Sequence, residues 1–190
     1  MLAVVYCHTH NGTVIGSKRP PRGSGKLKQV TSINAISKPF DGFWIKSAYR
    51  IPRGKFPLID RFISQETDVN TPITEMVVNS LITNIANGQS VPQGRALEIR
   101  GIAWDGGYGI ARVEVSTDAG QWWHAATLGP DYGRFSFRQW TFAADPRERG
   151  AMTVMAKATN RAGATQTFDL IANPAGYHHN VVQRVTLNVA

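Results

Sequence analysis

From Ala96 to the C-terminus, short stretches of alternating apolar and polar residues recur about every ten residues, separated by turn-forming residues. Such alternation places the apolar side chains on one face of each strand, so two sheets must pack face to face to bury them. The stretches read, in order, ALEIRGIAW, IARVEVSTD, WWHAATL, FSFRQWTFAA, MTVMAKAT, TQTFDL and VVQRVTLNV. Residues 76–85 add one more, which makes about eight strands, and no amphipathic stretch of helical length accompanies them. The pattern predicts an all-β, antiparallel sandwich.

The composition narrows the class of protein further. The chain has 190 residues, of which 42% are hydrophobic and 18% charged, which excludes a wholly disordered protein. Its single cysteine, Cys7, cannot form an intramolecular disulfide. The longest apolar runs are too short to cross a bilayer or to act as a secretory signal, so we expect no membrane partner.

The net charge of +8 is concentrated near the N-terminus. Residues 1–40 contain six bases and no acid, whereas the remaining 150 residues carry 15 bases and 13 acids. The six bases are Lys18, Arg19, Arg22, Lys26, Lys28 and Lys38. The segment GSKRPPRGSGKLK is typical of a solvated tail, with a phosphate-binding arm as the alternative. No helix-turn-helix or zinc-finger pattern accompanies it, so we expect no nucleic-acid partner and a disordered basic tail over residues 1–27.

The segment between this tail and residue 76 shows little periodicity of either kind. It contains Pro52, Pro57 and Pro72, and its aromatic residues include Phe40, Phe43, Trp44 and Tyr49. Long irregular segments in compact proteins are usually functional or packed on another domain. We therefore predict an irregular arm over residues 28–75 that lies against another surface.

The sequence Ser116–Trp123 has the pattern Ser-x-Asp-x-Gly-x-x-Trp and resembles the Asp-box of sialidases. In such a turn Asp118 can accept hydrogen bonds from backbone amides, Gly120 supplies a positive φ, and Trp123 folds over the turn. We interpret it as a structural turn, because a glycosidase would need a second carboxylate at a defined distance. The glycine-rich stretch Trp104–Gly109 precedes no helix, so it predicts a hairpin loop rather than a phosphate-binding loop.

Two further kinds of site are disfavoured by the sequence. Cys7, His8 and His10 lie close in sequence, as do His178 and His179, but neither group has the spacing of a structural zinc site. Adjacent histidines on a strand also point to opposite faces. The sequence contains no Gly-x-Ser-x-Gly nucleophile motif. We therefore predict neither a metal site nor a nucleophilic active site within this chain.

Several motifs taken together resemble the C-terminal dimerisation domain of the sulfite oxidase family of molybdenum enzymes. They are IRGIAWDGGYGIARVEVSTDAGQWWHAATL, FRQWTFAA, VMAKATNRAG and NPAGYHHNVVQRVTLNV. The preceding SINAISKPFDGFWIKSAYRIP resembles the segment that joins the cofactor domain to the dimerisation domain in bacterial sulfite dehydrogenases. The resemblance runs from about Lys28 to Ala190 and implies an immunoglobulin-like sandwich as the dimerisation domain over residues 76–190.

In that family an upstream domain binds a molybdopterin cofactor, whose molybdenum has one cysteine ligand, and oxidises sulfite to sulfate. The resemblance implies a homodimer, a heme or cytochrome c electron acceptor and a periplasmic parent enzyme. Cys7 lacks the expected sequence context for the molybdenum ligand. We therefore expect a truncated form that binds no cofactor alone, is inactive alone, and needs the cofactor domain as its partner.

The resemblance also implies roles for individual residues. Tyr49 matches the substrate-pocket tyrosine of the family, although an aromatic residue packed on the arm is the alternative. Lys28 matches a lysine that contacts the pterin cofactor. Arg184 matches an arginine that anchors an anion or the dimer, with an exposed strand arginine as the alternative. A pocket arginine of the animal enzymes falls at Ala175, next to Gly176. The rival interpretation of the whole chain is an immunoglobulin-like binding or adhesion module with no redox role.

Overall fold

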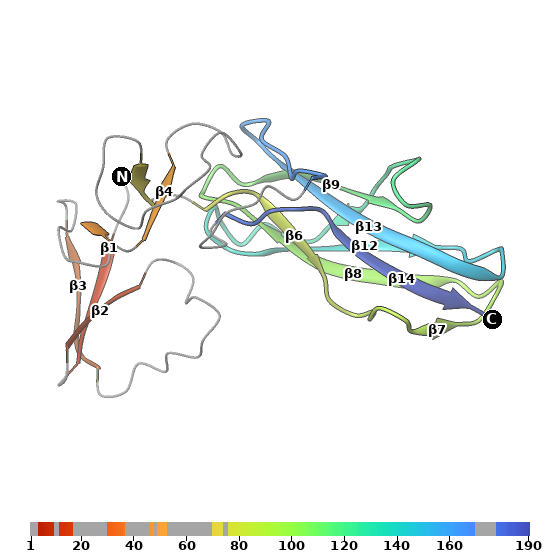
Figure 1. The fold of residues 1–190 in the computed structure, drawn as a ribbon, viewed down its shortest axis with the longest axis horizontal. Coiled ribbons are helices and arrows are strands. Elements are labelled where there is room, and N and C mark those ends of the chain that lie inside the picture. The colour runs from red at the N-terminus through yellow and green to blue at the C-terminus, as the bar shows by residue number, and fades with distance from the viewer. Residues whose placement is uncertain are drawn as a thin grey trace. The chain divides into compact units, whose positions relative to one another are not determined.

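The computed structural model describes residues 4–9, 12–16, 30–36, 46–47, 49–52, 70–73, 76–169 and 178–190 (Figure 1). The chain divides into two units. The first comprises residues 1–75 and 171–177, and the second comprises residues 76–170 and 178–190.

The described part of the first unit contains two small antiparallel sheets. One sheet has the order β2-β1-β3, with β1 at Val4–Thr9, β2 at Gly12–Gly16 and β3 at Val30–Ile36. The other pairs β4, Arg50–Pro52, with β5, Asn70–Pro72.

These strands differ from what the composition predicted for the N-terminal segments. Strands β1 and β2 lie within residues 1–27, where we expected a disordered tail, and β3 lies within the arm expected to be irregular. The sequences VVYCHT and VTSINAI are rich in β-branched residues, a local preference for extended pairing that the basic Gly- and Pro-rich composition obscured. The basic stretch itself lies outside the described residues.

The second unit is a sandwich of two sheets (Figure 1). The five-stranded sheet has the order β10-β9-β13-β14-β7 and the four-stranded sheet the order β11-β12-β8-β6. The first contains β7 Ser90–Val91, β9 Ile110–Ser116, β10 His124–Ala125, β13 Gly150–Asn160 and β14 Gln183–Val189. The second contains β6 Asn79–Ile82, β8 Leu97–Trp104, β11 Thr127–Leu128 and β12 Arg138–Ala144. The predicted all-β sandwich is confirmed, with β7 and β14 as a parallel pair among antiparallel neighbours.

The core lies between the two sheets, where the alternating apolar residues meet. On β14, Val185, Leu187 and Val189 are buried, whereas Arg184 and Asn188 on the opposite face are exposed. Burying each such aliphatic side chain contributes about 1.5–3 kcal/mol to folding, so the alternation fixes which face of the strand turns inward.

Gly101 makes room for the largest side chain in this core. It lies opposite Trp140, which is 1% exposed, in the pairing of β8 with β12. A Cβ atom at Gly101 would overlap both the indole ring of Trp140 and the carbonyl oxygen of Leu81. The glycine therefore allows the indole ring of Trp140 to lie over β8, an inner strand of the four-stranded sheet.

Two of the predicted strands turn out differently. The stretch WWHAATL forms two short strands, because the amide of Ala126 donates to the carbonyl of Val113 while the chain crosses from β10 in one sheet to β11 in the other. The stretch TQTFDL contributes only isolated bridges at Thr165 and Thr167. Because WWHAATL passes from one sheet to the other and closes one side of the sandwich, β10 and β11 both remain short.

Buried side-chain amides join the two sheets on the other side of the sandwich. The side chain of Gln183, which opens β14, accepts a hydrogen bond from the amide of Ile82 on β6 at 2.7 Å. The side-chain nitrogen of Gln166 donates to the side-chain oxygen of Asn79 at 3.0 Å, and its side-chain oxygen accepts from the amide of Ala158 at 2.9 Å. These bonds satisfy the amide of Ile82 at the end of β6, which lies at the edge of its sheet, and the amide of Ala158 on β13.

Candidate functional site

The glycine-rich loop Asp105–Gly109 connects β8 in one sheet to β9 in the other, so it is a crossing between the sheets and the prediction of a hairpin loop was wrong. The buried carboxylate of Asp105 organises it. One carboxylate oxygen accepts from the amides of Gly107 and Gly109, each at 3.0 Å, and the other accepts from the amide of Tyr108 at 3.1 Å and from the side chain of Asn160 at 3.1 Å. The loop is therefore built around one carboxylate.

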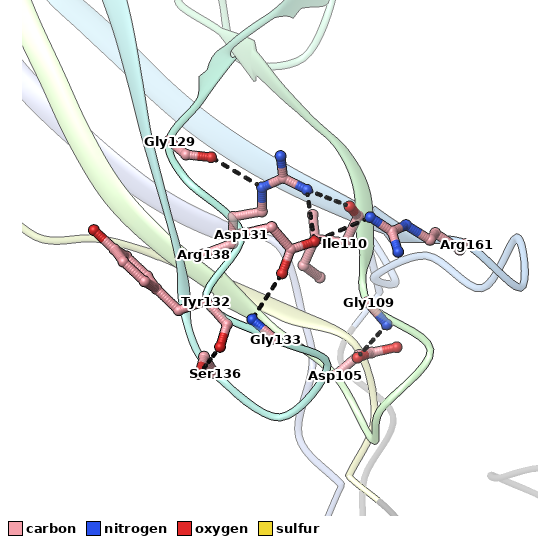
Figure 2. Close-up of polar contacts among 10 residues, drawn as sticks. All are labelled: Asp105, Gly109, Ile110, Gly129, Asp131, Tyr132, Gly133, Ser136, Arg138 and Arg161. Atoms are coloured by element: carbon pink, nitrogen blue, oxygen red, sulfur yellow. Dashed lines mark hydrogen bonds and ion pairs between the residues drawn. The ribbon is translucent and has the colours of Figure 1, made fainter.

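The neighbouring loop between β11 and β12 is held by an ion-pair cluster, in which Asp131 lies between two guanidinium groups (Figure 2). Its carboxylate is 3.0 Å from Arg161 and 3.4 Å from Arg138. The amide of Gly133, which donates to Asp131 at 3.0 Å, and the two arginines lower the pKa of that carboxyl. Arg138 also donates to the carbonyls of Gly129 and Ile110, so the cluster joins this loop to the start of β9.

Exposed aromatic side chains lie on these two loops. Four of the large exposed hydrophobic residues belong to them: Tyr108, Tyr132, Phe135 and Phe137, with exposed fractions between 55% and 72%. We call these four residues the loop-end patch. Such a concentration of aromatic surface on a soluble domain usually marks an interaction site.

The turn over Ser116–Trp123 has the geometry expected of an Asp-box, and it forms the hairpin between β9 and β10. Asp118 accepts from the amides of Gln121 and Trp122, each at 3.0 Å, and from the hydroxyl of Ser116 at 2.6 Å. Gly120 has a φ of 96°, as predicted. The hydroxyl of Ser116 and the amide of Trp122 lower the pKa of the Asp118 carboxyl.

This turn folds onto the outer face of the five-stranded sheet. The indole nitrogen of Trp123 donates to the carbonyl of Gly120 at 3.0 Å, and the ring lies 4.3 Å from the ammonium group of Lys157 on β13. Lys157 also forms an ion pair with Glu114 at 3.4 Å and lies over Phe168. The turn carries Trp122 beside this contact, with 72% of its surface exposed.

The residues predicted from the family resemblance fall in different parts of the chain. Tyr49 is half-buried in the first unit, where its carbonyl oxygen accepts from the amide of Ile73 at 2.9 Å. Arg184 is exposed on β14 of the second unit, opposite Met155. Lys28, Ala175 and Gly176 lie outside the described residues. The structure therefore gives the surroundings of Tyr49 and of Arg184, each within its own unit.

A buried arginine follows Tyr49, and sequence reasoning missed it. Arg50 is 3% exposed, and its guanidinium donates to both the side-chain and the main-chain oxygen of Asn70 and to the carbonyl of Lys46. Burying an unpaired guanidinium is costly, so these bonds fix β4 against β5. The signal in the sequence was the Tyr-Arg pair within SAYRIP, but its partner Asn70 lies too far along the chain to be inferred.

Neither a metal centre nor a membrane-spanning helix is found within the described residues. In them, no group of three or more His, Cys, Asp or Glu side chains is arranged to hold a metal ion. Cys7 and His8 lie on β1, of which only the backbone is described, and His10 lies outside the described residues. No helix described there is long and apolar enough to cross a membrane.

Comparison with known proteins gives the family. The model of the Mo-co oxidoreductase dimerisation domain matches residues 70–190, which include every strand of the sandwich. The chain belongs to this family. Among curated relatives of this dimerisation domain, mitochondrial sulfite oxidase of Macaca fascicularis is 30% identical over 176 residues, which cover 88% of this chain and 31% of that protein. The NADH nitrate reductase 2 of Phaseolus vulgaris is 31% identical over 130 residues, or 62% of this chain and 15% of that protein.

A solved structure shows the same fold. The sulfane dehydrogenase SoxCD of Paracoccus pantotrophus superposes with a TM-score of 0.57 at 22% identity, covering 83% of this chain and 41% of that one. The dimerisation-domain chain thus spans about a third of the length of the sulfite oxidases it matches. Relatives that carry the domain include both sulfite oxidases and nitrate reductases, so the domain alone does not specify the substrate.

Proposed function

We propose that this chain is the pairing domain of a molybdenum enzyme that oxidises sulfite to sulfate, joining two copies and completing one side of the substrate pocket. The observation that carries the proposal is the extent of the match to sulfite oxidases, which covers 88% of the chain and therefore includes part of the arm as well as the sandwich. If the chain shared only the pairing role with sulfite oxidases, similarity in the sandwich would be enough and similarity in the arm would not be needed.

The surface that we assign to pairing is the outer face of the five-stranded sheet. Trp122 and Phe168 are exposed there, at 72% and 45%, and Arg184 projects from β14 of the same sheet. Trp and Arg residues account for much of the binding energy in protein interfaces. In a symmetric dimer the same patch on each copy contacts its counterpart, so the exposed aromatic residues of this face would contact those of the second copy.

In catalysis this chain would contribute contacts in the substrate pocket and not the redox chemistry. The redox chemistry would be supplied by a molybdopterin cofactor held in an upstream domain, with a heme or cytochrome c as the electron acceptor and the periplasm as the site of the parent enzyme. Tyr49 would hydrogen-bond the anionic substrate through its hydroxyl, and Lys28 would contact the pterin. Without the upstream domain we expect the chain to bind no cofactor and to be inactive.

The experiment that tests this role is a fusion of a sulfite dehydrogenase cofactor domain ahead of Thr31. The fusion should transfer electrons from sulfite to an added cytochrome c. Tyr49→Phe should lower kcat/KM by a barrier change on the order of 1.5–3 kcal/mol, because one hydrogen bond to a charged oxyanion is lost.

Two controls accompany this experiment. Thr141→Val in the same fusion removes a hydroxyl from an exposed threonine on β12 of the sandwich and should leave sulfite kinetics unchanged. A fusion that retains cofactor and dimerises, but whose sulfite kinetics do not change on Tyr49→Phe, would remove the pocket role, while the pairing role would stand.

A further inference from the structure

The loop-end patch has a composition suited to protein recognition and is not used by the pairing face. Its residues Tyr108, Tyr132, Phe135 and Phe137 lie on the loops that follow β8 and β11. The pairing face, by contrast, lies on the five-stranded sheet and on the turn after β9. Aromatic side chains give large contact areas at low entropic cost, because they have few rotatable bonds.

The patch is held in place by bonds that do not depend on a partner. The guanidinium of Arg134 donates to the carbonyl of Gly107 at 2.8 Å and lies 5.1 Å from the ring of Phe135. The ring of Phe135 packs against Gly107, where a Cβ atom would overlap it. Phe137 packs edge to face on Trp104 with ring centroids 5.4 Å apart. A surface ordered in this way loses little conformational freedom when it binds.

The loops themselves are fixed on both sides of the patch. Asp105 collects three backbone amides of the loop after β8, and Asp131 links the loop after β11 to Arg138 and Arg161 (Figure 2). Exposed aromatic residues on ordered loops are costly to keep in water without a partner. The arrangement therefore indicates a contact surface of defined shape.

The chain enters the sandwich at the end that carries the loop-end patch, which indicates which partner the patch would contact. The chain enters the sandwich at Met76 and begins β6 at Asn79, which pairs with Trp104, the last residue before the Asp105 loop. It returns from residues 170–177 at His178, and the carbonyl of His179 accepts from the side chain of Asn79 at 3.0 Å. The polypeptide that precedes the sandwich and the segment that interrupts it are thus both attached at the end that carries the patch.

We propose that the loop-end patch is the docking surface for the cofactor domain of the same subunit. This inference rests on the proposed function. The chain covers only 31% of the length of the sulfite oxidases it matches, so most of such a subunit lies outside this sequence. The facing surface should be apolar, with a carboxylate or carbonyl oxygen opposite Arg134.

Binding of a separate cofactor domain to the full chain tests the proposal. The unmodified 190-residue chain, mixed with the purified cofactor domain of a bacterial sulfite dehydrogenase, should form a complex detectable by sedimentation velocity and titration calorimetry. The double variant Tyr132→Ser with Phe135→Ser should bind about tenfold or more weakly, because both side chains would contact the partner. The matched variant Trp122→Ser with Phe168→Ser should keep the affinity of the unmodified chain.

The outcomes separate this inference from the proposed function. Circular dichroism and thermal unfolding of each variant confirm that it folds. Equal binding by the two double variants would overturn the docking surface, as would the absence of any complex while the chain still forms dimers. Loss of dimerisation in the Tyr132 and Phe135 variant would assign the patch to self-association instead. A monomeric unmodified chain that binds the cofactor domain through the patch would contradict the pairing role and leave the docking surface intact.

Discussion

Two turns of the sandwich are each organised by one aspartate, yet they differ in what that aspartate supports. Asp105 is 4% exposed and closes a crossing between the sheets, whereas Asp118 lies at the surface and closes a hairpin within one sheet. Asp105 accepts four hydrogen bonds, from three amides and the side chain of Asn160. Asp118 accepts three, and water can replace them. Burial, rather than the turn motif, therefore determines how much of the fold depends on each carboxylate.

The largest expected effect is the loss of the buried carboxylate. Asp105→Ala leaves buried donors without an acceptor, so we expect the free energy of unfolding to fall by about 3–5 kcal/mol. Asp105→Asn keeps one acceptor oxygen, so its free energy of unfolding should lie between those of the unmodified chain and Asp105→Ala. Urea denaturation followed by tryptophan fluorescence measures both. Asp118→Ala is the matched variant and should lose clearly less stability. Equal losses for the two alanine variants would contradict the claim that burial determines how much of the fold depends on each carboxylate.

The glycines of the two turns give the next effect. Gly107 has a φ of 117° and Gly120 a φ of 96°, so alanine strains the backbone at both, by about 1–3 kcal/mol. At Gly107 the new Cβ would also overlap the ring of Phe135, whereas at Gly120 it would meet the sulfur of Met155 at 3.4 Å and the ring of Trp123 at 3.6 Å without overlap. Thermal unfolding should show the larger loss for Gly107→Ala. The reverse order would contradict the packing described for the loop-end patch.

The smallest effect is in the acid dependence of stability. The pKa of Asp118 is lowered below its ordinary value of 3.8 in the folded protein, by the Ser116 hydroxyl first and the Trp122 amide next. Its ionised form therefore stabilises the fold above that value, and the contribution is lost as the pH falls through the lower folded pKa. Asp118→Asn should be less stable at neutral pH and should lose less on acidification. If the free energy of unfolding of Asp118→Asn and that of the unmodified chain fell by the same amount down to acid pH, this prediction would be refuted.

The sequence was informative about strands and local turns because these depend on neighbouring residues. The alternation in VVQRVTLNV predicted which residues of β14 are buried, and the Asp-box pattern predicted the bonds of Asp118 and the φ of Gly120. The same reasoning failed for Trp104–Gly109, because the loop joins different sheets and nothing local distinguishes such a crossing from a hairpin.

Contacts between distant residues were beyond the sequence. Asp131 is 30 residues from Arg161, and the buried Arg50 is 20 residues from Asn70, so only the folded chain brings them together. The candidate site residues came from family resemblance alone. For Tyr49 and Arg184 the structure provides the surroundings of each residue within its own unit.

The oligomeric state of the purified chain tests the pairing role most directly. Sedimentation equilibrium at micromolar concentrations should give the mass of two 20.9 kDa chains. The variant Trp122→Ser with Arg184→Glu should shift the chain toward monomer, because it removes an aromatic contact and reverses a charge on the proposed face. Tyr132→Ser with Phe135→Ser, on the loop-end patch, should remain dimeric. A folded, unmodified chain that sediments as a monomer across this range would contradict the account.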